Sequence, residues 1–136
     1  MRKKILFLAG MMACSSLAGA QEISKTWVAD KGNGTYQNPV LHADYSDPDI
    51  CAAGDDFYMT ASSFNCIPGI PILHSNDLVN WSLVNYALPV QEPESFFDKA
   101  QHGKGVWAPA IRFHNGEFYI YWGCLLYTSP SPRDGL

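Results

Sequence analysis

The sequence predicts an all-β protein, and three observations lead to that prediction. Short runs of β-prone residues alternate with turn-forming residues along most of the chain. No stretch keeps a helical hydrophobic period over three turns. The pattern of one hairpin also recurs 61 residues later, which suggests repeated β-units. The chain has 136 residues, 47% of them hydrophobic and 13% aromatic, so it allows one globular domain at most.

Residues 1–20 have the layout of a secretory signal peptide. A basic start, Met1–Lys4, precedes the apolar stretch Ile5–Ala13, which is too short to span a bilayer. Ala18-Gly19-Ala20 supplies the small residues of a cleavage site, so Gln21 would begin the mature chain. The sequence therefore predicts a secreted or periplasmic location.

Charge and cysteines narrow the possible functions. Beyond the first 20 residues, six basic residues stand against 13 acidic ones, which disfavours binding to nucleic acid or anionic lipid. No membrane span, zinc-type Cys/His spacing or phosphate-binding loop is present in the sequence. Two alternatives stay open: lipid anchoring at Cys14, or a buried N-terminal helix. Cys51 and Cys66 either pair or remain free thiols.

The predicted elements are short and follow one another closely. Residues 21–37 are polar and Gly-rich and form a lead-in. Asn115-Gly116, between two β-rich runs, predicts a tight hairpin. The expected strands are Ile50–Ala53, Phe57–Ala61, Ile70–His74, Leu83–Leu88, Ala110–Phe113 and Glu117–Trp122, with turns at Gly54-Asp55-Asp56 and His114-Asn115-Gly116.

A shift of 61 positions aligns two segments of the chain. The matched pairs are Pro48 with Pro109, Ile50 with Ile111, Asp56 with Glu117, Phe57 with Phe118, Tyr58 with Tyr119 and Met59 with Ile120. Either two generic hairpins resemble each other by chance, or these are repeats of a radial architecture such as propeller blades. In a propeller the residues just before the repeated proline, Asp47 and Ala108, would face the central channel.

The segment Asp44–Asp49 holds three carboxylates in six positions. In an extended run, alternation would send Asp47 and Asp49 to the same side. One interpretation is an Asx-turn cluster, in which the side chains bond nearby backbone N–H groups. The other is a carboxylate aimed into a sugar-binding channel, as general base or nucleophile.

Aromatic residues support the second interpretation, because sugar C–H faces pack on rings while polar groups bind the hydroxyls. The candidates are Phe64, Trp81, Trp107 and Trp122. Trp107 leads directly into the second Pro-x-Ile unit, beside the expected channel mouth; a core tryptophan is the alternative. Trp81 follows turn formers and is expected to be structural.

Several motifs in order resemble family 43 glycoside hydrolases, most closely the β-xylosidase and α-L-arabinofuranosidase branches. The resemblance covers about residues 38–123. The motifs are Asn38-Pro39-Val40-Leu41, Tyr45-Ser46-Asp47-Pro48-Asp49-Ile50, Gly54-Asp55-Asp56-Phe57-Tyr58, Ser62-Ser63-Phe64, the stretch Pro68–Trp81, and Val106-Trp107-Ala108-Pro109.

The resemblance implies a five-bladed β-propeller, of which this chain would hold blade 1 and the start of blade 2, and hydrolysis with inversion. Asp47 matches the family's general base. Phe64 and Trp107 match residues that shape the sugar pocket, and Ala108 matches their neighbour in that wall. Asp49 stands where relatives often carry Ser, so no catalytic role is assigned to it.

The resemblance also implies groups that this chain lacks. In relatives, an Asp that orients the acid comes shortly after the strand matching Phe118–Gly123, and the general acid, a Glu, comes later. No metal ligand is expected here: a calcium ion occupies the channel in some relatives, but its ligands would lie beyond this segment. The expected partner is an oligo- or polysaccharide, and no cofactor is expected.

Residues 124–136 do not continue the β pattern. Cys124–Asp134 looks like a translated sequencing-library adaptor, a non-native tail; a genuine Pro-rich linker is the alternative. On the first interpretation the chain is a truncated gene product with a base but no acid, and we expect it to be inactive.

Two other functions stay open at this point. The first is a non-catalytic carbohydrate-binding propeller, in which Asp47 only hydrogen-bonds sugar hydroxyls. The second is a small β-module that binds another protein through its aromatic residues.

Overall fold

A computed structural model describes residues 26–124 and 126. The predicted signal peptide, its alternative at Cys14, and all but two residues of the predicted tail lie outside the described residues. Within the described part, no helix is both long and apolar enough to cross a membrane.

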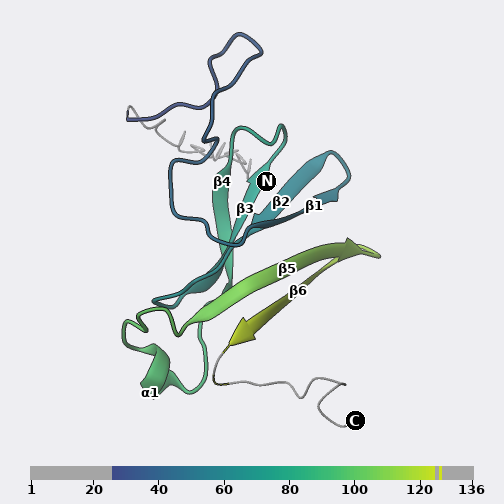
Figure 1. The fold of residues 1–136 in the computed structure, drawn as a ribbon. Coiled ribbons are helices and arrows are strands. Elements are labelled where there is room, and N and C mark those ends of the chain that lie inside the picture. Colours follow the sequence, from purple (N-terminus) through teal and green to yellow (C-terminus); the bar gives the residue numbers. More distant parts are fainter. Residues whose placement is uncertain (1–25, 125, 127–136) are drawn as a thin grey trace, which may run out of the picture.

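Two antiparallel sheets make up the structure (Figure 1). The first has the order β1-β2-β3-β4, and the second is the hairpin β5-β6, drawn beneath the first sheet in that view. The strands are β1 Asp49–Ala53, β2 Asp56–Thr60, β3 Gly69–Ser75, β4 Ser82–Leu88, β5 Val106–His114 and β6 Glu117–Cys124. The all-β prediction is confirmed.

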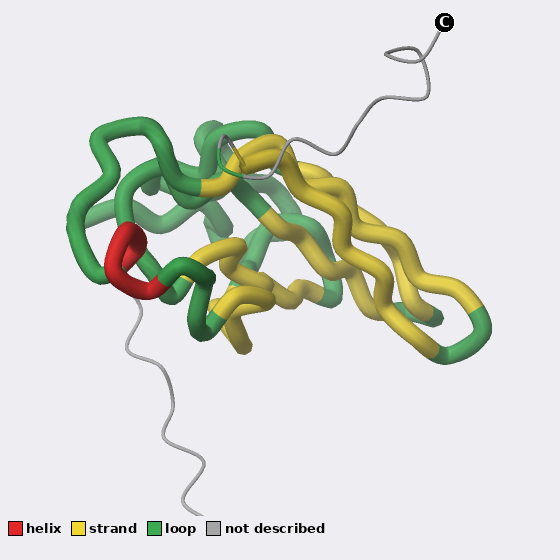
Figure 2. Tube along the Cα trace, turned by 90° about the horizontal axis from the view of Figure 1, so that it is seen from below, coloured by secondary structure: helices red, strands yellow, loops and turns green. Residues whose placement is uncertain are grey.

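One short helix, α1 (Glu94–Phe97), was not expected from the sequence. Figure 2 shows it as a single turn among the loops at one end of the molecule, while strands make up the rest of the regular structure. Four residues cannot show a helical hydrophobic period, so sequence pattern could not have revealed it.

Tight turns join the strands of both hairpins, as predicted. Asn115 and Gly116 connect β5 to β6 with φ of 51° and 82°. Positive φ at both central residues is the geometry that Asn-Gly favours and that matches the twist of the strands. In the first hairpin, Gly54 takes φ 66°.

The 61-residue repeat is present in the backbone as well as in the sequence. Strand β1 ends at residue 53 and β5 ends at residue 114, which is 61 positions later. Strand β2 begins at residue 56 and β6 begins at residue 117, again 61 positions later. All five residue pairs of β1-β2 reappear in β5-β6 with the same offset; Asp49↔Thr60, for example, becomes Ala110↔Tyr121. The two segments therefore form hairpins with the same two-residue loop length and the same register, as repeated propeller units would.

Strand β5 begins earlier than the sequence suggests. The prediction began at Ala110, because a proline removes a ladder hydrogen bond. The strand in fact starts at Val106, and its register with β6 shifts between Trp107 and Ala110. This irregularity accommodates Pro109 inside the strand.

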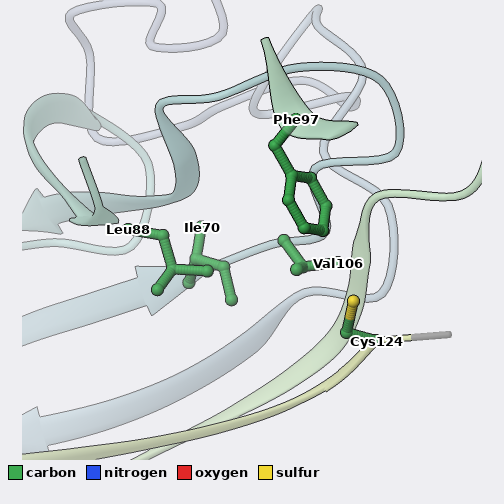
Figure 3. Packing of buried hydrophobic residues seen from close by; sticks show 5 residues of the cluster. All are labelled: Ile70, Leu88, Phe97, Val106 and Cys124. Atoms are coloured by element: carbon green, nitrogen blue, oxygen red, sulfur yellow. The ribbon is translucent and has the colours of Figure 1, made fainter. Parts of the chain in front are cut away.

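A small hydrophobic core joins the two sheets (Figure 3). Its buried members come from β3, β4, α1, β5 and β6, and they are Ile70, Leu88, Phe97, Val106 and Cys124. Cys124, which the sequence suggested as the first residue of a tail, is thus the buried end of β6. Burial of these side chains fixes the second hairpin against the first sheet.

The cysteines among the described residues are free thiols. Cys51 is half-buried, Cys66 is exposed and Cys124 is buried. The disulfide between Cys51 and Cys66 that the sequence left open is therefore absent from this structure.

Candidate active site

Asp47 lies in the loop just before β1, and its backbone is in the left-handed region with φ 50°. Its repeat counterpart, Ala108, has φ 44°. Left-handed geometry is unfavourable for residues with a Cβ, by about 1–2 kcal/mol. Such outliers concentrate where a fold holds a functional side chain in place. The same unusual bend thus occurs before the repeated proline in both hairpins.

The Asp47 carboxylate is held by Ser62, which is half-buried. Ser62 Oγ donates a hydrogen bond of 2.7 Å to Asp47 Oδ2 and accepts one of 2.8 Å from the backbone N–H of Ala108. The backbone N–H of Ser62 donates to the carbonyl of Ser46 at 2.9 Å. One hydroxyl therefore links the two left-handed positions of the repeat.

A local turn does not engage the Asp47 side chain. Among the described residues its partner is Ser62, 15 positions away. Asp77 shows the contrasting behaviour: its carboxylate accepts from the backbone N–H groups of Val79 and Asn80, two and three residues on. Those bonds, that of Asn80 first, lower the pKa of Asp77 to about 2. The Asx-turn interpretation thus describes Asp77, and the exposed carboxylate of Asp47 remains accessible.

Asp49 is hydrogen-bonded to the second hairpin, unlike the side chain of Asp47. Its Oδ2 accepts hydrogen bonds from the backbone N–H of Ile111 at 2.7 Å and from Arg112 Nη1 at 2.5 Å. It therefore ties β1 to β5. The sequence suggested that strand alternation would send Asp47 and Asp49 to the same side. That expectation is wrong in its premise, because the backbone at Asp47 is left-handed rather than extended.

Phe64 and Trp107 lie on two segments that run side by side. Ser63 and Val106 exchange two backbone hydrogen bonds, of 2.9 and 3.0 Å. The backbone N–H of Gly105 donates to the carbonyl of Phe64 at 3.0 Å. These bonds bring the segment 62–64 against the segment 105–108. Asp47, Phe64, Trp107 and Ala108 therefore belong to one connected region, with Ser62 as the link.

The two aromatic side chains have different surroundings. Phe64 is half-buried and lines a cleft of about 270 Å³ together with Tyr45 and Tyr86. Asp47 and Trp107 are not among the lining residues of that cleft. Trp107 is also half-buried, and its indole N–H donates to the carbonyl of Gly103 at 3.0 Å.

Trp81 also matches its predicted structural role. Its indole N–H donates to the carbonyl of Leu78 within the same loop, at 3.0 Å.

The comparison with protein-family models gives one match, to glycosyl hydrolases family 43, over residues 36–133. That match spans well over half of the chain. The chain belongs to glycosyl hydrolase family 43. The matched range includes residues 124–133, and their suggested non-native origin remains a prediction.

Similar proteins with glycosidase names agree with that assignment. The non-reducing end α-L-arabinofuranosidase BoGH43B of Bacteroides ovatus is 41% identical over 86 residues, which are 63% of this chain and 16% of that protein. A β-xylosidase of Bacillus subtilis is 42% identical over 99 residues, which are 72% of this chain and 17% of that protein. The chain thus spans less than a fifth of the length of these relatives.

A solved structure of the family shows the same fold. A bifunctional GH43-CE protein of Bacteroides eggerthii matches with a TM-score of 0.60 and 37% identity, over 66% of this chain and 13% of that one. The chain is therefore part of a family 43 propeller. Strands β1–β4 form one blade, and β5-β6 form the first hairpin of the next.

Ser62 is the member of this site that sequence reasoning did not single out. The sequence shows Ser62 only as part of a family motif, because the two groups that its hydroxyl binds lie 15 and 46 residues away along the chain. No group of three or more His, Cys, Asp or Glu side chains within the described residues could hold a metal ion.

Proposed function

We propose that this chain carries the general base of an inverting glycosidase, and that Asp47 is that base. The observation that carries the proposal is the exposed Asp47 carboxylate, held at a left-handed bend by a hydroxyl from a distant segment. Among the residues that the structure describes, the Asp47 carboxylate makes no hydrogen bond within a local turn, and Ser62 fixes one of its two oxygens, so the other oxygen can bind a ligand. Family 43 membership supplies the reaction class.

The chemistry follows from single displacement. The base takes a proton from water on one face of the sugar ring while a carboxylic acid protonates the departing oxygen on the other face. The two carboxyl groups stand roughly 6.5–9.5 Å apart to leave room for the water. Asp47 supplies the first group, and the acid comes from outside the described segment. We therefore propose that the 136-residue chain alone does not hydrolyse glycosides.

The proposed substrates are xylosides and arabinofuranosides, in the form of xylan- or arabinan-derived sugars. This choice rests on the activities named for the two relatives, an arabinofuranosidase and a xylosidase. Phe64, Trp107 and Ala108 are proposed to form part of the wall around the sugar, because the segments that carry them meet beside Asp47.

Export is proposed on the sequence alone. The charged start, short apolar stretch and small-residue cleavage site of residues 1–20 support a secreted or periplasmic enzyme. Mass spectrometry of the N-terminus after expression in a bacterial host tests this. We expect a start at Gln21; an intact Met1 would contradict it.

A chimera tests the proposed reaction. Residues 36–123 of this chain replace the aligned segment of the Bacillus subtilis β-xylosidase, and that enzyme supplies the rest of the protein. Proton NMR of aryl β-xyloside hydrolysis should show α-xylose as the first product, because inversion reverses the anomeric centre. First-formed β-xylose, or sugar binding by the folded chimera without turnover, would contradict the proposal; the second result would favour a sugar-binding module.

A further inference from the structure

The hydroxyl of Ser62 makes two hydrogen bonds, one to the carboxylate of Asp47 and one with the backbone N–H of Ala108. A serine hydroxyl carries one proton to donate and lone pairs that accept. The Ala108 N–H donates to the oxygen at 2.8 Å, and the hydroxyl donates to Asp47 Oδ2 at 2.7 Å. An amide that donates to a hydroxyl also polarises it, which strengthens the bond that the hydroxyl makes to an acceptor. The rotation of the hydroxyl is therefore set, and its proton points to the carboxylate.

The backbone of Ser62 is fixed by the same two regions. Its N–H donates to the carbonyl of Ser46, the residue before Asp47. The next residue, Ser63, pairs in both directions with Val106 on β5. Ser62 is thus held between the loop that carries the carboxylate and the strand that carries Ala108.

The repeat provides an internal comparison. A shift of 61 places Asp47 on Ala108 and Ser62 on Gly123. The second hairpin lacks the carboxylate, and it also lacks the hydroxyl at the matching place. The carboxylate and its partner therefore occur together in one hairpin and are absent together from the other.

We propose that Ser62 is a positioning residue for the hydrolytic reaction, which holds one oxygen of Asp47 so that the other faces the attacking water. This inference rests on the proposed role of Asp47 as general base. An exposed aspartate without such a bond would sample several rotamers. Because a general base must lie within hydrogen-bond reach of the proton it takes, fixing Oδ2 restricts where Oδ1 can meet water.

A role for Ser62 in stability alone is the competing explanation, and kinetics separate the two. In the chimera with the Bacillus subtilis β-xylosidase, Ser62→Ala should lower kcat roughly 10- to 100-fold, the range of a hydrogen bond to a charged group. KM should change less than about twofold, because ground-state binding is untouched. Ser62→Thr keeps the hydroxyl and should retain most of the activity.

Ser63→Ala is the matched control. It removes the neighbouring hydroxyl, which accepts from the backbone N–H of Ile70 at 2.8 Å and does not contact Asp47. This variant should lower the melting temperature while kcat stays near that of the parent chimera. Equal loss of kcat in Ser62→Ala and Ser63→Ala would overturn the proposal.

A double-mutant cycle supplies the decisive comparison. If Ser62 acts through Asp47, then Ser62→Ala should cause no further loss of kcat once Asp47→Asn is present. The same fold-loss in both backgrounds would mean that Ser62 acts independently of Asp47, and would overturn the positioning role. Unchanged kcat in Asp47→Asn alone would instead refute the base assignment, so the two failures are distinguishable.

Discussion

The hairpins β1-β2 and β5-β6 share a register and a left-handed residue at the same place, but they carry different chemistry there. The first has the Asp47 carboxylate and the Ser62 hydroxyl; the second has the Ala108 methyl group and Gly123. Ala108 contributes its backbone N–H instead, which donates to Ser62. The comparison teaches that the repeat determines the position of a side chain, while the residue at that position determines its chemistry.

Hydrogen bonds also connect the two hairpins directly. Asp49 of the first hairpin binds the backbone of the second, and Val106, the first residue of β5, pairs with Ser63, which follows β2. Substitutions that break these connections should therefore lower the stability of the fold.

Gly105 permits the closest approach between the two regions. A Cβ at this position would lie 2.2 Å from the carbonyl oxygen of Ser63 and 2.8 Å from that of Phe64. Backbone oxygens cannot move away cheaply, so Gly105→Ala should lower the free energy of unfolding by about 3 kcal/mol. Denaturant titration measures this.

Gly123→Ala is the control for that change, since its Cβ would meet nothing closer than 3.7 Å. It should leave stability unchanged or raise it slightly, because alanine loses less backbone entropy on folding than glycine. Similar destabilisation by both variants would contradict the close-contact explanation.

Asp49 should matter more for stability than the arginine that it binds. Asp49→Ala leaves the N–H of the buried Ile111 without its acceptor, which costs about 2 kcal/mol. Arg112→Ala removes a side chain that is 62% exposed, and should cost less than about 1 kcal/mol. Denaturant midpoints of the two variants check this order; equal losses would show that the ion pair, which both variants lack, accounts for the whole effect.

Ala108→Gly should be nearly neutral, because glycine occupies φ 44° without steric cost and this gain offsets its larger entropy in the unfolded chain. Ala110→Gly, two residues on within β5, should cost about 0.5–1 kcal/mol. If both glycine variants lose the same amount of stability, the left-handed strain at position 108 is absent.

The turn hydrogen bonds of Asp77 should make the stability of the fold depend on pH. The pKa of Asp77 in the folded chain, about 2, lies below its ordinary value of 3.8. The stabilisation from its turn bonds is therefore present above about pH 4 and lost as the pH falls towards 2. Asp77→Asn should flatten this part of the stability curve. The effect should be small, because Asp77 is exposed and solvent screens its interactions.

Local sequence signals were sufficient to predict the two hairpins and their repeat. Asn115-Gly116 and Gly54 define tight turns, and runs rich in aromatic and other β-prone residues define the strands beside them. The repeated proline then identified Asp47 and Ala108 as equivalent positions before any geometry was known. The hairpin turns depend on neighbouring residues, and the repeat depends on comparing two short motifs 61 positions apart, so neither inference needs a spatial contact.

Other features depend on long-range contacts and were not predictable. The link through Ser62 joins residues 15 and 46 positions apart, and nothing in a single sequence specifies such a contact. The start of β5 was misplaced because proline is uncommon inside a strand, whereas pairing with β6 accommodates Pro109 through a register shift. The different surroundings of Asp47 and Asp49 could not be predicted either, because they depend on the left-handed backbone angle at residue 47.

The most direct test of the central claim is the rescue of Asp47→Ala in the chimera by azide. This anion attacks without a base, so it replaces the step that Asp47 performs on water. We predict that Asp47→Ala lowers turnover in water ~10²–10⁴-fold, and that azide restores turnover to give a glycosyl azide of inverted anomeric configuration. Turnover in water equal to that of the parent chimera would contradict the assignment of Asp47 as the base.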